Sequence, residues 1–358
     1  MEMTTETGDS RSATLMLHLL GRCNLTCQHC YMEGAPERRE RLPLNLVLSA
    51  VGECADLGIR TLYLTGGEPL LYPGLDAVLR AAAGVPALEI TVCTNGTLVT
   101  ERWAALLHEA RAKVNISVDG DPEFHDRFRN LPGAFRSSER GIRRLVEQGV
   151  AVTIIATISR GNLDRLASMA EWAANTGAVQ FRAQPLLKLG RGEEITDQCL
   201  TRVEMNRLLL HLTDMANLYR ARGLKCNLVG ASRSFLMKHP CGAYVCNGTG
   251  CHRHVEQEIK KLVIREDGTI LPEVTNLSHE FAIGRIEDGP LIPQVRRYFD
   301  EGYRRFDRLC RSAYAEILPQ WESEFVPWDQ IVAERSHAWR DQGLVEIAAA
   351  ACGTCSCD

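Results

Sequence analysis

The sequence predicts an α/β protein built from parallel β/α repeats, and three observations support this prediction. Six short segments rich in β-branched and apolar residues occur within the first two-thirds of the chain. Each is followed by a longer segment whose apolar residues recur with helical spacing. Gly-Gly, Asn-Gly and Asp-Gly pairs mark turns between them. Strands that alternate with helices in this way pair in parallel through right-handed crossovers.

The expected strands and helices follow one another in order along the chain. We expect strands at residues 14–20, 61–65, 89–94, 114–118, 152–157 and 178–185. We expect helices at residues 45–57, 74–83, 101–110, 137–148 and 162–176, and a long one at 202–222. Parallel sheets place their working residues on the loops beyond the carboxyl ends of the strands. The residues after each expected strand are therefore the first candidates for a site.

Composition and charge restrict the class of protein. The chain has 358 residues, with 41 Lys and Arg against 45 Asp and Glu, a formal net charge of −4. This balance argues against bulk binding to nucleic acid or to an anionic membrane. The N-terminus is polar and acidic, unlike a signal peptide, and we expect residues 1–12 to be disordered. Fourteen cysteines without a secretory signal indicate a reducing, cytoplasmic location in which thiols serve metals.

Three cysteines after the first expected strand form the most specific motif. Cys23, Cys27 and Cys30 have Cys-x-x-x-Cys-x-x-Cys spacing within RCNLTCQHCY. Three thiolates can hold three irons of a four-iron cluster and leave the fourth iron free to bind and activate a small molecule. Their spacing alone leaves a structural zinc site open, since His29 could supply a fourth ligand.

A second motif follows the second expected strand. Residues 61–69 have the sequence TLYLTGGEP, in which Gly66, Gly67, Glu68 and Pro69 end an apolar β-rich run. Paired glycines let a ligand approach the backbone closely, and Glu68 offers a carboxylate for a cationic amine.

Together these two motifs resemble the radical S-adenosylmethionine (SAM) superfamily, over about the first two-thirds of the chain. The resemblance implies a partial (β/α)6 TIM-type barrel as the fold. It also implies a [4Fe-4S] cluster whose open iron is chelated by the amine and carboxylate of SAM. An external donor such as flavodoxin or ferredoxin would supply the electron that cleaves SAM to methionine and a 5′-deoxyadenosyl radical for hydrogen abstraction. The resemblance gives His29 a packing role.

The ends of the next three expected strands carry small polar residues. Asn95, Ser117 and Asp119 follow the third and fourth strands, and Arg160 follows the fifth. Side chains of this kind can hydrogen-bond ribose hydroxyls, an amine or a carboxylate, although Asn-Gly and Asp-Gly pairs also form ordinary turns. The resemblance implies that Ser117 and Asp119 contact the ribose and the methionine end of SAM. It also implies that Arg160 faces the SAM carboxylate.

A second thiol region begins after residue 240. Cys241, Cys246 and Cys251 precede a hairpin-like segment at residues 261–272, and Cys310 follows it. This arrangement resembles the SPASM/twitch extension, which holds auxiliary iron–sulfur clusters. Glu273 stands where that family has a cysteine, and a single cysteine closes the region, so we expect one auxiliary cluster held by some of these four thiols. Glu273 as an oxygen ligand, a zinc site and no metal at all remain alternatives.

The C-terminal residues divide into two parts. We expect an aromatic-rich helical cap at residues 319–347 and a flexible tail at 348–358. The tail contains Cys352, Cys355 and Cys357, for which we rank metal or cluster ligation first, ahead of thiol exchange or a role as a peptide substrate. The expected core domain spans residues 13–230 and the auxiliary domain 231–318.

The function expected from these features is that of a radical SAM enzyme that matures a ribosomally made peptide. A radical SAM step on a small biosynthetic intermediate, such as a modified tetrapyrrole, is the alternative within this class. A non-catalytic iron–sulfur or zinc carrier is the alternative from another class. We expect no nucleic-acid or membrane partner.

Overall fold

The computed structural model of the chain describes residues 13–238 and 260–339. Cys241, Cys246 and Cys251 lie outside the described residues, and so does the tail with its three cysteines. Their expected roles as metal ligands therefore stay predictions, as does the expected disorder of residues 1–12.

A ten-stranded sheet organises the protein, with the strand order β11-β10-β9-β1-β2-β3-β4-β5-β6-β7. Its central strands follow the order of the sequence and pair in parallel, which confirms the predicted β/α repeats. A seventh strand, which the sequence did not predict, follows the six predicted strands. These strands are β1 (Ala13–His18), β2 (Ile59–Thr65), β3 (Glu89–Thr94), β4 (Lys113–Ser117), β5 (Val152–Ile158), β6 (Gln180–Pro185) and β7 (Lys225–Leu228).

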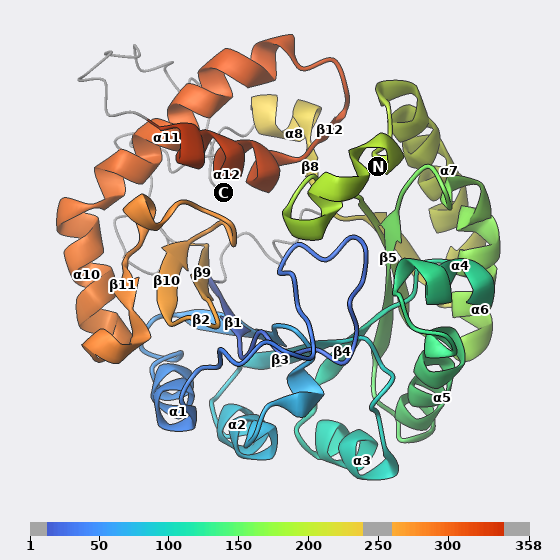
Figure 1. Cartoon of the computed structure of the whole chain (residues 1–358), viewed down its shortest axis with the longest axis horizontal. Helices are drawn as coiled ribbons and strands as arrows, with labels where there is room; N and C mark the ends of the chain where they lie inside the picture. Colours follow the sequence, from blue (N-terminus) through green and yellow to red (C-terminus); the bar gives the residue numbers. More distant parts are fainter. Residues whose placement is uncertain (1–12, 239–259, 340–358) are drawn as a thin grey trace.

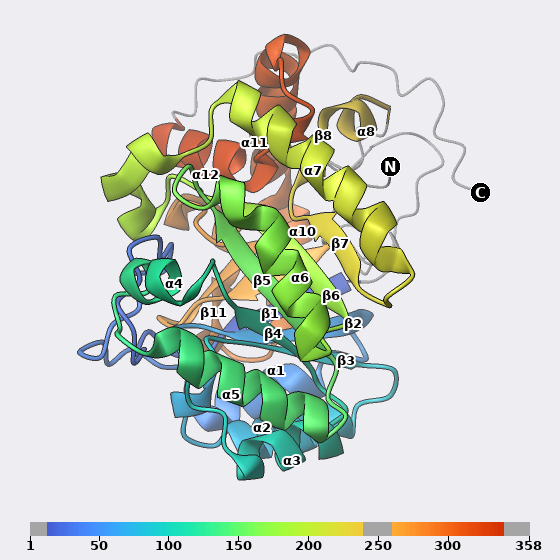
Figure 2. The same ribbon diagram turned by 90° about the vertical axis from the view of Figure 1, so that its right-hand side faces the viewer.

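Amphipathic helices cover one side of this curved sheet (Figure 1). They bury their apolar faces against the strands, as the helical spacing predicts. Figure 2 shows α5, α6 and α7 running side by side over the later strands. The helices of this layer are α1 (Leu44–Gly52), α2 (Leu75–Ala83), α3 (Glu101–Glu109), α5 (Ala134–Glu147), α6 (Leu166–Thr176) and α7 (Arg202–Arg220).

One short helix, α4 (Pro122–Phe128), was not predicted. It follows β4 and is capped by Asp121, whose side chain accepts a hydrogen bond from the Phe124 backbone N–H. Proline at the first position is pre-organised for a helix start. At seven residues the helix is too short to show a periodic apolar pattern.

The segment after residue 260 continues the core sheet. Strands β9 (Lys261–Ile264) and β10 (Thr269–Pro272) form the predicted hairpin, and β11 (Gly284–Arg285) extends it. Strand β9 also pairs in parallel with β1, from Thr14 against Lys261 to Leu17 against Ile264. This hairpin completes the sheet beside the first strand. The predicted division into a core at 13–230 and an auxiliary domain at 231–318 stays a prediction.

Helices and a small second sheet follow the hairpin. Strands β8 (Ala231–Ser232) and β12 (Phe325–Val326) pair with each other, and helix α8 (Arg233–Lys238) directly follows β8. Part of the predicted cap, residues 319–347, is helical. No helix in residues 13–238 and 260–339 is long and apolar enough to cross a membrane. The remaining helices are α10 (Leu291–Glu301), α11 (Tyr303–Ile317) and α12 (Trp328–Ala338).

Candidate metal centre

The three cysteines lie on one loop that connects β1 to α1. Isolated bridges from Leu20 to Arg41 and from Arg22 to Ala35 close this loop on itself. Cys23 and Cys27 are buried and Cys30 is half-buried. The structure brings the three thiols together in one small cluster of side chains, separate from the main core, with Leu25 and Leu131.

Each of the three sulfurs accepts an N–H donor. The backbone N–H of Leu25 lies 3.4 Å from Cys23 Sγ, and that of Gly34 lies 3.4 Å from Cys30 Sγ. The Arg129 guanidinium lies 3.8 Å from Cys27 Sγ. Donors of this kind stabilise thiolates and tune iron–sulfur clusters. The donor set therefore fits a cluster held by three cysteines.

The zinc alternative depends on a fourth ligand beside the three cysteines. Within residues 13–238 and 260–339, no group of three or more His, Cys, Asp and Glu side chains is arranged to hold a metal ion. A four-iron cluster differs from such an ion because its thiolates bind separate irons. His29, the candidate fourth zinc ligand, is instead stacked on Phe128 with ring centroids 4.1 Å apart.

Burial disfavours the thiolate form of two of these cysteines. Burial raises the pKa of Cys23 to about 12, with further contributions from Glu68 and the neighbouring cysteines. Burial likewise raises the pKa of Cys27. Since metal ligands must be deprotonated, binding a cluster here releases protons.

The Gly-Gly turn packs against the backbone of the cysteine loop. The N–H of Gly67 donates to Leu20 O at 2.7 Å, and the N–H of Glu68 donates to Arg22 O at 2.9 Å. A Cβ atom on Gly67 would lie 2.2 Å from Arg22 O. Gly66 has a φ of +133°, and its Cβ would lie 2.6 Å from Leu20 O. The glycines thus permit the backbone of the cysteine loop to approach closely. The sequence had suggested that they permit a ligand to approach.

Glu68 joins the ends of β2 and β3. Its carboxylate is completely buried and accepts hydrogen bonds from Thr94 Oγ1 at 2.6 Å, Asn95 N at 2.9 Å and Leu70 N at 3.1 Å. Burial raises its pKa, against the lowering effect of these donors. Pro69 begins the short 3-10 helix η1 (Pro69–Leu71). In this structure the carboxylate therefore braces the turn that holds the cysteine loop.

Asn95 brings the end of β3 to the first cysteine. Its Nδ2 donates to Asn24 Oδ1 at 2.9 Å and lies 4.0 Å from Cys23 Sγ. Its Oδ1 accepts from the Thr97 backbone N–H at 2.9 Å. The end of β3 therefore lies beside the cysteine loop, and the role of Asn95 in SAM binding stays a prediction.

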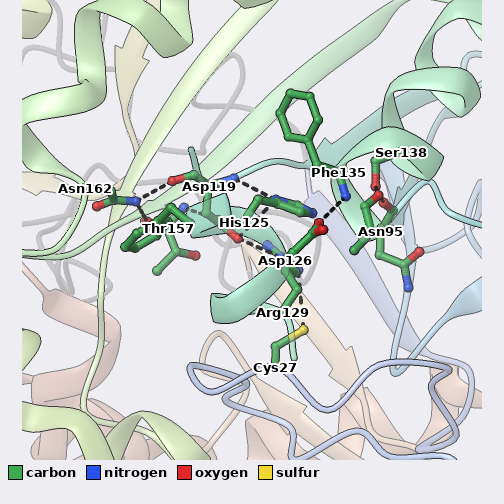
Figure 3. Close-up of polar contacts among 12 residues, drawn as sticks. Cys27, Asn95, Asp119, His125, Asp126, Arg129, Phe135, Ser138, Thr157 and Asn162 are labelled. Carbon is green, nitrogen blue, oxygen red and sulfur yellow. Dashed lines mark hydrogen bonds and ion pairs between the residues drawn. The ribbon is translucent and has the colours of Figure 1, made fainter. Parts of the chain in front are cut away.

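Asp119 is completely buried and faces other protein groups. Its Oδ2 lies 2.6 Å from Arg129 Nε, and its Oδ1 accepts from Thr157 N at 2.9 Å (Figure 3). Burial would raise its pKa, but Arg129, His29 and His125 outweigh that effect and lower the pKa to about 2. Ser117 lies half-buried at the end of β4, two residues away.

Arg160 lies against α7. Its Nε is 3.0 Å from Glu204 Oε2, and its Nη1 donates to Asp197 O at 3.1 Å. Glu204 also forms the capping box at the start of α7 with Thr201. The Arg160 guanidinium therefore pairs with a capping residue of α7 and with a nearby backbone carbonyl, and these contacts do not involve the cysteine loop.

Two arginines that the sequence did not single out hold the cysteine loop. Arg191, in the 3-10 segment η3 (Gly190–Gln198), donates through Nε to Cys27 O at 2.7 Å and through Nη2 to Gly34 O at 3.0 Å. Its backbone N–H donates to Cys30 O at 3.1 Å. Arg38, on the loop itself, lies 2.9 Å from the buried Glu266 of the β9–β10 turn. No local sequence signal marks either contact.

Cys310 lies inside helix α11. Its side chain is 3% exposed and belongs to the main core cluster. Burial, together with Glu273, Asp307 and Asp329, raises its pKa well above the ordinary value. The Glu273 carboxylate accepts hydrogen bonds from Lys260 N at 2.5 Å and Lys261 N at 3.3 Å. Ligation by Cys310 or Glu273 remains a prediction.

Sequence comparison finds relatives of the first half of the chain. Residues 17–173 match the model of the radical SAM superfamily. An AdoMet-dependent heme synthase of Oleidesulfovibrio alaskensis is 31% identical over 58% of this chain and 54% of its own length. The sporulation killing factor maturation protein SkfB of Bacillus subtilis is 32% identical over 50% of this chain and 43% of its own. The chain spans about half the length of these curated relatives.

Solved structures share the fold. The structure of anSMEcpe with bound AdoMet superposes with a TM-score of 0.63 at 16% identity, covering 92% of this chain and 96% of that one. SuiB of Streptococcus suis, bound to S-adenosylmethionine, gives a TM-score of 0.59 at 17% identity, covering 74% and 60%. Residues 17–173 therefore match the radical SAM superfamily in sequence, and the described fold is shared with these solved structures.

Proposed function

We propose that the chain holds a [4Fe-4S] cluster through Cys23, Cys27 and Cys30 and cleaves SAM reductively. The observation that carries this proposal is the gathering of three thiols on one loop, each with its own N–H donor. When bound, such a cluster supplies an open iron for SAM and the electron that breaks its carbon–sulfur bond.

The surrounding residues receive roles from their contacts. Gly66 and Gly67 allow the cysteine loop to lie against the β2 turn, while Glu68 and Pro69 fix that turn. Asn95 offers its side chain beside Cys23. These residues form the wall of the proposed SAM site nearest the cluster.

The other three candidates are Ser117, Asp119 and Arg160, which lie at the ends of later strands. In this proposal Ser117 contacts SAM directly, and the other two act through neighbouring residues. Ser117, half-buried at the end of β4, is assigned to the ribose end of SAM. Asp119 acts through Arg129, which it contacts directly. Arg160 acts through the position of α7, where it pairs with Glu204.

For the substrate we propose a ribosomally made peptide. The fold likeness to anSMEcpe extends over nearly the whole of both chains, and one structure of that protein contains the Cp18Cys peptide. Relatives in sequence include SkfB and the subtilosin biosynthesis protein AlbA of Bacillus subtilis, the latter 30% identical over 54% of this chain. Their names describe the maturation of a sporulation killing factor and the biosynthesis of the bacteriocin subtilosin.

A modified tetrapyrrole is the second candidate substrate. It is favoured by the AdoMet-dependent heme synthases, one of which, from Methanosarcina barkeri, is 34% identical over 49% of this chain. Identity to these proteins is close to identity to SkfB, so sequence similarity alone does not rank the two substrates.

The cluster and the substrate can be tested separately. Anaerobically reconstituted protein is expected to bind four irons at this site. After one-electron reduction with dithionite, it is expected to give an electron paramagnetic resonance signal that changes when SAM is added. The Cys23→Ala/Cys27→Ala/Cys30→Ala variant is expected to lose that signal. A signal that is retained in the variant contradicts the assignment of these ligands.

For the substrate, a synthetic cysteine-containing peptide and iron coproporphyrin III are supplied in parallel reactions with SAM and reductant. The proposal predicts a mass change in the peptide that requires SAM. A mass change confined to the porphyrin would establish the second candidate instead.

A further inference from the structure

Arg129 links the cysteine loop to a buried carboxylate at the end of β4. It follows directly after α4, and its side chain is 9% exposed. Its Nε lies 2.6 Å from Asp119 Oδ2, and its Nη1 lies 3.8 Å from Cys27 Sγ (Figure 3). One guanidinium therefore contacts a fixed anion on one edge and a candidate cluster ligand on another.

The position of this guanidinium is set by the groups that hold Asp119. Thr157 N donates to Asp119 Oδ1, and Asn162 Nδ2 donates to the backbone carbonyl of Asp119 at 2.6 Å. The backbone N–H of Asp119 donates to His125 Nδ1 at 3.2 Å. These contacts come from β5, the turn after β5 and α4. Asp119 therefore has little freedom to move, and it orients the planar fork of Arg129.

The charge of Arg129 is retained despite its burial. Its Nε lies 2.6 Å from the Asp119 carboxylate, which compensates the cost of burying the guanidinium. Arginine stays protonated in proteins, so a permanent positive charge lies beside Cys27. Being buried, this charge is screened less by water and salt than a surface charge would be.

We propose that Arg129 is a positioning residue that donates a charge-assisted hydrogen bond to the Cys27 thiolate and raises the reduction potential of the cluster. This inference rests on the cluster assignment in the proposed function. One-electron reduction by an external donor adds a negative charge to the cluster. A nearby buried cation stabilises the reduced form more than the oxidised form. Hydrogen bonds to the sulfurs and net charge are established determinants of cluster potentials.

The test measures the midpoint potential of the cluster in full-length reconstituted protein without SAM. Arg129→Met alone would leave Asp119 buried and unpaired, which destabilises the fold. The informative variant is therefore Asp119→Asn/Arg129→Met, which removes both charges. We expect its reduction equilibrium to be about tenfold less favourable, equal to a potential roughly 59 mV lower for a one-electron couple. Arg129→Lys keeps the charge but not the planar guanidinium, and its midpoint potential is expected to lie between those of wild type and the double variant.

A surface arginine serves as the matched control. Arg80 pairs with Asp76 on the exposed face of α2, and Arg80→Met is expected to leave the potential unchanged. Potentials equal to wild type in both Arg129 variants, at equal iron content, would overturn the inference. If the double variant does not incorporate iron, the Arg129→Lys potential decides by the same criterion.

Two further outcomes separate this inference from its alternatives. Unchanged potentials with weaker SAM binding would assign Arg129 to the SAM carboxylate and also overturn the inference. A wild-type protein that binds no [4Fe-4S] cluster would overturn the proposed function itself, and it is recognised before any Arg129 variant is measured.

Discussion

His18 ends β1 with an imidazole whose two ring nitrogens have no hydrogen-bond partner among the residues that the structure describes. The side chain is completely buried, and its ring meets that of Tyr31 edge-on with centroids 6.1 Å apart. Burial, with Arg265 and Lys261 nearby, lowers its pKa to about 3. The folded protein therefore keeps this histidine neutral where an unfolded chain would begin to protonate it near pH 6.5.

The sign of the resulting pH dependence follows from these two values. Between about pH 6.5 and 3 the unfolded chain binds the additional proton, so stability falls as the pH falls. His18 adds a slope of up to about 1.4 kcal/mol per pH unit in this window. We expect His18→Leu to flatten the pH dependence of urea unfolding between pH 6.5 and 4.5. The exposed His108→Gln is the control. If the free energy of unfolding depended on pH in the same way in wild type and His18→Leu, the predicted contribution of His18 would be contradicted.

Gly67 tests how closely the two loops of the site must approach. A Cβ there would overlap the carbonyl oxygen of Arg22, a backbone atom that cannot rotate away. We expect Gly67→Ala to lower the free energy of unfolding by about 1–3 kcal/mol and to reduce iron incorporation. Gly52→Ala is the matched control, because no atom lies within 4 Å of the new Cβ at that helical position. Equal stability of the two variants would contradict the close contact between the Gly-Gly turn and the cysteine loop.

At the scale of elements, η3 holds the cysteine loop through Arg191. Loss of the guanidinium removes the hydrogen bonds to Cys27 O and Gly34 O. We expect Arg191→Met to lose iron several-fold faster to a chelator, as followed by absorbance under anaerobic conditions. The control is Arg144→Met, since Arg144 also donates to a backbone carbonyl, that of Val99, but lies on α5. A loss rate equal to that of the control would contradict the role of Arg191 in holding the cysteine loop.

The elements themselves could be predicted from local sequence to differing degrees. The strand at 89–94 matches β3 at both ends, because its apolar run is bounded by a clear turn signal. Strand β7 was missed because its sequence, KCNL, is only four residues long and carries no alternation beyond that length. The pairing of β9 with β1 was also missed. It joins residues more than two hundred positions apart, and no local pattern reports such a partner.

At the scale of the whole molecule, the sequence predicted which residues start the site but not what holds them. Cys23, Cys27 and Cys30 were found because their spacing is itself a ligand pattern. The contact of Arg129 with Cys27 spans 102 residues, and that of Arg191 with Cys27 spans 164. Glu68 was expected to face an amine, and its burial against Thr94 emerges only when β2 and β3 are side by side. Such contacts depend on the assembled sheet.

The central claim is that Cys23, Cys27 and Cys30 hold a cluster that cleaves SAM. Its most direct test is the release of 5′-deoxyadenosine after anaerobic reduction of the reconstituted protein with SAM, measured by mass spectrometry. We predict release by wild type and none by the variant in which all three cysteines are alanine. Wild-type protein that carries the cluster and binds SAM, yet releases no 5′-deoxyadenosine above that variant, would contradict the claim.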